Sequence, residues 1–146
     1  MAKKKVSPIK KLDFLIGRWH TKGEILQGGS DSSKEIRGMD TYEWIPGEFF
    51  ILHRVDVLMG KERTEVIEII GYDKSRKSYF MTSFDNQGKS LTMYADLAKA
   101  GILKLGDKKM RSILTANKNG HSMIAKWEIS TNGKTWKPWM NIKFNK

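Results

Sequence analysis

Three histidines, His20, His53 and His121, are the residues of this sequence whose charge can change near neutral pH. His53 alternates with Ile51 and Val55 in an apolar stretch, so we expect its side chain on the inner face of a strand. A lone histidine on an apolar face is more often a core residue than a ligand. It can also contact a bound molecule, because binding pockets combine an apolar lining with a few polar groups. His53 is therefore the candidate for a functional side chain, and the other two histidines are expected to face solvent.

Metal, nucleophilic and phosphate-binding sites lack the residues that they need. The chain has no cysteine and no His-x-His or His-Glu-x-x-His spacing, so we expect no metal site. It has no Gly-x-Ser-x-Gly nucleophile elbow, and Gly28-Gly29 lacks the lysine and the following helix of a phosphate-binding loop. Glu65 and Glu68 fall on opposite faces of a predicted strand, so their spacing does not pair two acids for hydrolysis. No catalytic residue and no cofactor are assigned.

Basic and aromatic residues near the end of the chain raise the question of nucleic-acid binding, which requires both on one surface. The residues concerned are Lys134, Trp136, Lys137 and Trp139. Alternation places Trp136 with Met140 on the core face, which leaves Trp139 as the one exposed aromatic side chain. We therefore expect no nucleic-acid partner.

The net charge of +11 is unevenly distributed along the chain. Residues 1–11 carry five lysines and no acid, residues 12–98 have a net charge of −3, and residues 99–146 have a net charge of +9. A region this basic could face phosphate, an anionic membrane or an acidic ligand. We interpret it as a solvated lysine face that keeps the protein soluble, because scattered lysines on exposed strand positions need no partner.

Targeting and membrane segments are not evident in the sequence. The basic start is not followed by an apolar stretch of about seven residues or more, so no signal peptide is predicted. No apolar run approaches the roughly 18 residues of a transmembrane helix. The absence of cysteine suits a reducing compartment. We expect a soluble, cytoplasmic protein.

The elements that position these side chains are predicted to be short strands. Nine turn signals rich in Gly, Asn, Asp and Pro separate ten segments, which is typical of an antiparallel barrel or sandwich. The segments are 18–26, 35–45, 48–58, 62–72, 77–84, 89–96, 101–105, 108–116, 121–130 and 135–144. Residues 8–16 predict one short helix, with Ser7 as N-cap and Pro8 in the first turn. The length of 146 residues fits one domain.

Segment 77–84 is apolar on both of its faces. Phe80 and Phe84 face one way, and Tyr79 and Met81 face the other. An apolar outer face indicates that a second subunit covers it, so a homodimer is predicted.

Six short motifs in order along the chain resemble one protein family. They are Leu12-x-Phe14-Leu15-x-Gly17-x-Trp19, Tyr42-x-Trp44 with Pro46-Gly47, Gly71-Tyr72-Asp73, Tyr79, Asp85-x-x-Gly88 and Asn132-Gly133-Lys134-x-Trp136. The ordered set resembles small bacterial lipocalin-like proteins of the calycin superfamily, and more specifically the DUF1579 family, a domain of unknown function.

The resemblance implies an all-β fold, a single antiparallel up-and-down β-barrel of about ten strands with a short N-terminal helix. Residues 1–11 would form a basic N-terminal segment and residues 12–146 the barrel domain. Gly17 and Trp19 match the pair that opens the first strand, with the tryptophan packed across the closed end. Nitrobindin-like barrels of related fold bind haem through a histidine on the penultimate or last strand, where this chain offers only His121 beside a turn.

Two functions remain open at this point. The first is binding of a small hydrophobic or amphipathic ligand in the barrel interior. The residues expected to line that interior are Trp44, Phe49, Ile51, His53, Met93, Trp127 and Met140. The alternative is a haem-binding or enzymatic barrel that uses His53. A solid core without a cavity would show the same apolar stripes.

Overall fold

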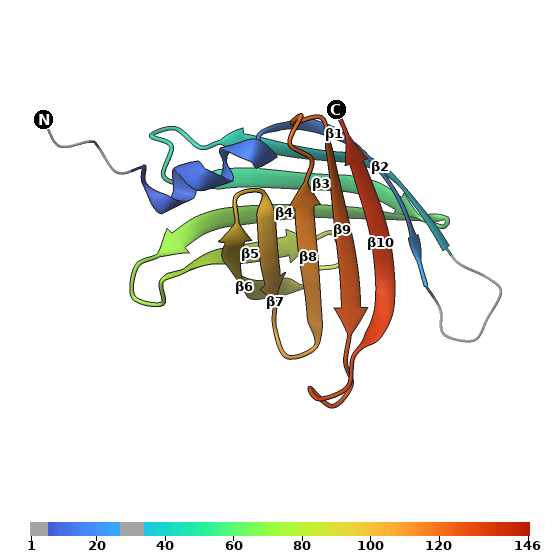
Figure 1. Cartoon of the computed structure of the whole chain (residues 1–146). Helices are drawn as coiled ribbons and strands as arrows, with labels where there is room; N and C mark the ends of the chain where they lie inside the picture. Colours follow the sequence, from blue (N-terminus) through green and yellow to red (C-terminus); the bar gives the residue numbers. More distant parts are fainter. Residues whose placement is uncertain (1–5, 27–33) are drawn as a thin grey trace, which may run out of the picture.

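The computed structural model describes residues 6–26 and 34–146. These residues form a closed barrel of ten antiparallel strands in the order β1-β10-β9-β8-β7-β6-β5-β4-β3-β2 (Figure 1). The strands are β1 (Gly17–Ile25), β2 (Lys34–Trp44), β3 (Ile51–Met59), β4 (Glu62–Asp73), β5 (Ser78–Asp85), β6 (Ser90–Lys99), β7 (Ile102–Gly106), β8 (Met110–Ala116), β9 (Ser122–Ile129) and β10 (Lys137–Asn145). The helix that precedes them, η1 (Pro8–Leu15), is a 3₁₀ helix. The predicted all-β fold and the single short N-terminal helix are confirmed.

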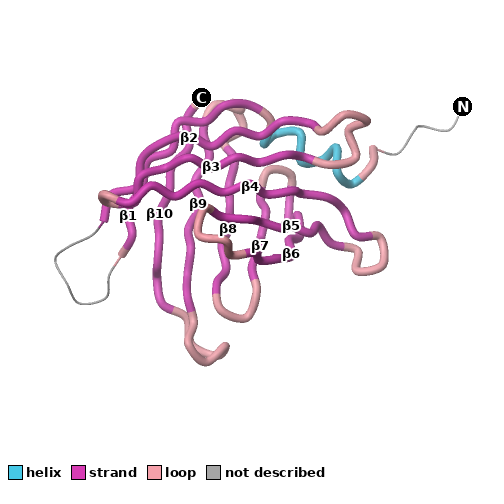
Figure 2. The backbone as a smooth tube through the Cα atoms, turned by 180° about the vertical axis from the view of Figure 1, so that it is seen from behind, coloured by secondary structure: helices cyan, strands magenta, loops and turns pink. Residues whose placement is uncertain are grey.

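The strands form because apolar residues alternate with polar ones, which gives each strand an inner and an outer face. On β9 the side chains of Met123 and Ala125 are buried, whereas those of Ile124 and Lys126, which alternate with them, are exposed. Figures 1 and 2 show that strands β2 to β4 cross strands β8 to β10 at a steep angle. Strands packed in this crossed manner form two walls that face each other across the interior.

Helix η1 covers one end of the barrel. Its residues Ile9, Leu12 and Leu15 are buried against the barrel interior. Trp19 on β1 is 1% exposed, and its indole N–H donates a hydrogen bond of 2.8 Å to the backbone carbonyl of Leu15. The Tyr79 hydroxyl on β5 donates one of 2.7 Å to the carbonyl of Pro8. This end is therefore filled by side chains, and Trp19 is buried there as expected.

The start of β10 corrects one expectation from strand alternation. A register shift lies between Pro138 and Met140 in the pairing of β10 with β9, so Trp139 joins the inner face. Its ring lies edge-on to that of Trp127, with centroids 6.0 Å apart. Trp136 precedes the strand, and the guanidinium of Arg111 lies 4.1 Å from its ring centroid. The prediction that Trp136 belongs to the core face and Trp139 to the surface is wrong, because alternation does not continue through a bulge.

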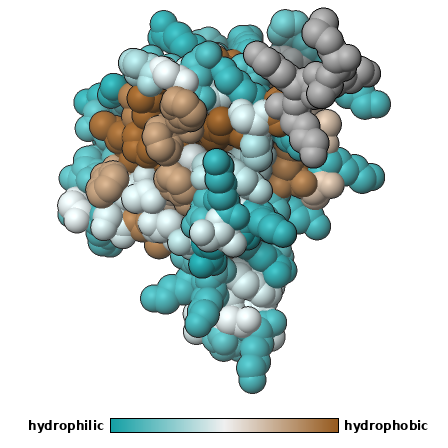
Figure 3. Space-filling view, turned by 90° about the vertical axis from the view of Figure 1, so that its left-hand side faces the viewer, coloured by the Kyte–Doolittle hydropathy of each residue, from teal (hydrophilic) through white to brown (hydrophobic). Residues whose placement is uncertain are grey.

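Apolar side chains are also present on the outer surface of the barrel (Figure 3). Ile67 on β4 and Phe84 on β5 are cross-strand partners and are 43% and 53% exposed. On the inner side of β5, Tyr79 and Met81 are buried. Segment 77–84 is thus apolar on both faces, and a homodimer through this surface stays a prediction. No helix in the described ranges is long and apolar enough to cross a membrane.

Candidate functional site

A cavity of about 350 Å³ lies in the barrel interior. Most of the side chains that line it are apolar. The polar lining residues are Thr21, Asp40, Tyr42, His53, Glu68, Ser83, Asp85 and Ser112. Several lining residues, such as Met59, Asp85 and Met110, stand at strand ends opposite the end that η1 covers. The cavity therefore extends from the middle of the barrel toward the end that lacks the helix.

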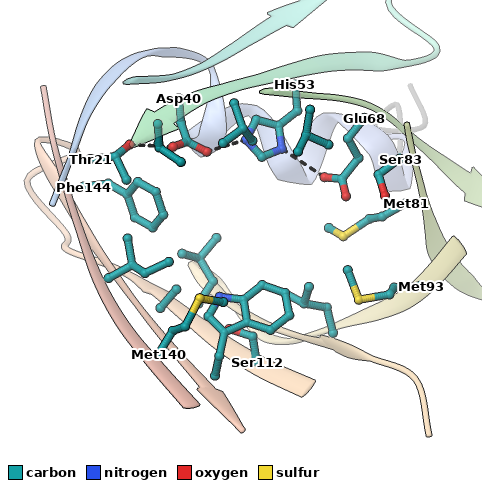
Figure 4. A pocket seen from close by; sticks show the side chains of 18 of the residues that line it. Thr21, Asp40, His53, Glu68, Met81, Ser83, Met93, Ser112, Met140 and Phe144 are labelled. Atoms are coloured by element: carbon teal, nitrogen blue, oxygen red, sulfur yellow. Dashed lines mark hydrogen bonds and ion pairs between the residues drawn. The ribbon is translucent and has the colours of Figure 1, made fainter. Parts of the chain in front are cut away.

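Five neighbouring strands contribute to a row of polar side chains on the same wall of the cavity. These are Thr21 on β1, Asp40 on β2, His53 on β3, Glu68 on β4 and Ser83 on β5 (Figure 4). The register explains the row, since His53 pairs with Glu68, and Glu68 pairs with Ser83. Directly paired residues of adjacent strands point to the same face of a sheet.

His53 lies between two carboxylates and is 8% exposed. Its Nε2 lies 2.6 Å from Asp40 Oδ2, and its Nδ1 lies 3.0 Å from Glu68 Oε1. A neutral imidazole has one N–H, so the ring can donate to two carboxylates at once only as an imidazolium. The Thr21 hydroxyl donates to the other oxygen of Asp40. Both ring nitrogens of His53 are thereby occupied by protein groups.

Tyr42 completes this cluster from the neighbouring position on β2. Its ring stacks on the His53 ring with centroids 3.9 Å apart and planes 9° from parallel. Burial, together with the charges of Asp40 and Glu68, raises the pKa of Tyr42 well above its ordinary value. The phenol therefore stays neutral, and its ring covers one face of the His53 imidazole.

The pKa of His53 is the balance of opposing effects. Burial lowers it, and the hydrogen bonds to Asp40 and Glu68, together with their charges, raise it, so that the pKa rises from 6.5 to about 9. Burial alone would lower the pKa of a histidine on the inner face of a strand. Two acids reach it, which explains the opposite direction.

This raised pKa gives a testable dependence of stability on pH. The folded state holds the proton more tightly than the unfolded state, so the contribution is full below pH 6.5 and is lost as pH rises through about 9. A shift of this size corresponds to about 3 kcal/mol of unfolding free energy. NMR titration of the His53 ring signals measures this pKa. Deprotonation of His53 near pH 6.5 would contradict the geometry.

The wall opposite the polar row is mainly apolar. Figure 4 shows Met93, Met140 and Ser112 across the cavity from His53. Ser112 is 2% exposed, and its hydroxyl has no hydrogen-bond partner in the described part of the chain. A buried hydroxyl without a partner is costly, and a bound molecule with a polar group would supply one.

Four of the seven predicted lining residues surround this cavity, namely His53, Met93, Trp127 and Met140. Ile51 is fully buried but lies outside the lining. Trp44 packs near the helix, where its indole N–H donates to Asp13 Oδ1 at 3.2 Å. Whether the four lining residues bind a ligand stays a prediction.

Phe49 departs most from the expectation. Its side chain is 71% exposed in the connection between β2 and β3. The segment expected to begin at residue 48 begins at Ile51, because Gly47 and Glu48 adopt positive φ angles of 93° and 59°. Such angles belong to turns and interrupt the alternation that would have placed Phe49 inside.

Sequence reasoning missed Asp40 and the cluster to which it belongs. The signal was present, because Asp40 alternates with Ile36 and Tyr42, which places an acid on the inner face of a strand. Glu65 and Glu68 do lie on opposite faces, as the spacing predicts. Glu65 is exposed and pairs with Arg63 at 3.0 Å, whereas Glu68 is 9% exposed.

Comparison with known proteins places the chain in a family. The family described as a protein of unknown function, DUF1579, matches residues 7–146. No curated protein matches the chain. Among solved structures, Rv2717c from M. tuberculosis is similar, with a TM-score of 0.67 and 10% sequence identity over 97% of this chain and 99% of that one. At this identity the likeness concerns the fold alone. The match over nearly the whole chain shows that this protein belongs to the DUF1579 family.

Proposed function

We propose that this protein binds a small hydrophobic or amphipathic molecule inside its barrel, as a lipocalin-like member of the calycin superfamily, in the cytoplasm. The observation that carries the proposal is the apolar cavity of about 350 Å³ with one polar wall. Its volume lies at the lower end of the range of about 300–1,000 Å³ for small-molecule sites. The unpartnered Ser112 hydroxyl supports the proposal, because a ligand with a polar group would satisfy it.

Haem binding or catalysis through His53 receives less support from the geometry. A histidine that binds iron or accepts a proton needs a nitrogen with a free lone pair. Both nitrogens of His53 face carboxylates, at 2.6 and 3.0 Å. The ring therefore serves better as a fixed part of the wall than as a reactive group.

A cavity-filling substitution tests the proposal. Ala125 on β9 is buried and lines the cavity, so Ala125→Phe would occupy ligand space. The neutral dye N-phenyl-1-naphthylamine should show saturable fluorescence with the parent protein and bind at least about tenfold more weakly to this variant, a loss of about 1.4 kcal/mol.

Ile124→Phe is the matched control, because Ile124 precedes Ala125 on the same strand and is 44% exposed on the outer face. It should leave dye affinity unchanged. Thermal melting of both variants checks that they fold. Absence of saturable binding to the parent protein, or equal binding to a folded Ala125→Phe variant, would refute binding inside the barrel.

A further inference from the structure

The cavity lining has a charge balance opposite to that of the whole protein. The chain carries 27 Lys and Arg against 16 Asp and Glu. In the ranges that the structure describes, no lysine or arginine lines the cavity, whereas Asp40, Glu68, Asp85 and the single histidine His53 do. Charges act more strongly in an apolar interior than across water. The lining residues, rather than the surface lysines, therefore determine which ligand charge the interior favours.

The cluster of Asp40, His53 and Glu68 keeps a net charge of −1 however its protons are shared. An imidazolium between two carboxylates sums to −1, and transfer of one ring proton to either carboxylate leaves that sum unchanged. One further proton would be needed to neutralise the cluster. The polar wall is thus negative in both arrangements.

The cavity also offers hydrogen-bond acceptors that the protein leaves free. Glu68 uses Oε1 for His53, at 3.0 Å, and its Oε2 has no hydrogen-bond partner in residues 6–26 and 34–146. The Ser112 hydroxyl on the opposite wall also lacks a partner. Figure 4 shows the Glu68 side chain extending into the cavity beside Met81. A partly free buried carboxylate favours a positively charged donor, because hydrogen bonds between charged groups are the strong ones.

We propose that the ligand is a cationic amphiphile, a molecule with a protonated amine on an apolar body. The ammonium group lies against Glu68, within the negative wall. The body lies on the opposite wall, against Met93, Met140 and Trp127. This inference rests on the proposed function, since it concerns the ligand of the same cavity.

The apolar wall suits such a ligand in two ways. Methionine side chains adapt to bodies of different shape, and Met81, Met93 and Met140 all line the cavity. The rings of Trp127 and Trp139 add large apolar surfaces against which the body can pack. An anionic amphiphile such as a fatty acid would instead place its carboxylate against a lining to which the described residues contribute no lysine or arginine.

Three ligands of equal chain length test the inference. Octylammonium, octanol and octanoate compete with N-phenyl-1-naphthylamine for the parent protein at pH 7. Octylammonium should displace the dye at the lowest concentration and octanoate at the highest. All three ligands have eight carbon atoms, so the order reports mainly on the head group.

Two glutamates on β4 provide a matched pair of variants. Glu68→Gln removes the interior charge and keeps an oxygen that accepts from His53, whereas Glu65→Gln removes the same charge from the exposed face of the strand. Glu68→Gln should weaken the binding of octylammonium about tenfold or more, which is the size of a lost charge-assisted hydrogen bond. The affinity for octanol should stay within about twofold of the parent value. Glu65→Gln should leave the affinities for all three ligands unchanged.

The outcomes separate this inference from the proposed function. If the dye does not bind the parent protein, the proposed function itself fails. If the dye binds but octanoate competes as well as octylammonium or better, the cavity binds ligands and the cationic preference is refuted. If a folded Glu68→Gln variant bound all three ligands more weakly by the same factor, the cationic preference would also be refuted. The comparison of ligands on the parent protein stands even if that variant does not fold.

Discussion

Replacement of His53 by alanine is expected to lower the free energy of unfolding by about 3–5 kcal/mol, as for removal of one partner from a buried ion pair. The substitution leaves the carboxylates of Asp40 and Glu68 on one wall without the cation between them. It also removes the ring on which Tyr42 stacks. Urea unfolding at pH 7 measures the change.

Two further variants make this prediction specific to the charge cluster. His20→Ala removes an exposed histidine from β1 and should leave the midpoint of unfolding almost unchanged. Combining His53→Ala with Asp40→Asn and Glu68→Gln should recover part of the lost stability. The uncharged amides replace two carboxylates that would otherwise repel each other without the histidine between them. A single His53→Ala variant as stable as His20→Ala would show that the cluster does not support the fold.

Replacement of Trp19 by alanine is expected to cost about 3–5 kcal/mol, the usual range for removing a buried tryptophan. Trp19 is 1% exposed beneath the helix, and its indole N–H donates a hydrogen bond to the Leu15 carbonyl. Its loss would leave a void at the end of the barrel that η1 covers, and it would remove the hydrogen bond between β1 and the helix. Urea unfolding again provides the measurement.

Trp136→Ala is the control for this substitution. Trp136 is half-buried outside the barrel, where its ring contacts Arg111. The same loss of an indole ring should cost much less there, because no interior void forms. Equal midpoints for the two tryptophan variants would mean that Trp19 does not close the barrel.

The strands could be predicted from the sequence because their period of two is a local property. Turn residues separated all ten of them. The alternation of Met123, Ala125, Trp127 and Ile129 predicts the inner face of β9 correctly except for Ile129, which is 37% exposed. Local interruptions were missed by the same reasoning. Pro138 marks the bulge and the Pro46-Gly47 turn precedes Glu48, but strict alternation does not allow for the residues that such interruptions displace.

The charge cluster could not be predicted because it depends on register between strands. Alternation placed His53 inside, but only the pairing of β3 with its two neighbours shows that acids flank it on both sides. Likewise, apolar stripes are the same for a solid core and for a hollow one. The cavity follows from how the two walls cross, which is a property of the assembled barrel.

The central claim is that a small molecule binds inside the barrel, and the methionines report on it directly. Met81, Met93 and Met140 line the cavity, whereas Met39 on β2 does not. In the protein labelled with ¹³C at the methionine methyl groups, saturating N-phenyl-1-naphthylamine should shift the NMR signals of Met81, Met93 and Met140, three of the five methionines that line the cavity. The Met39 signal should stay in place. Unchanged signals from Met81, Met93 and Met140 at saturating dye would contradict binding in the interior.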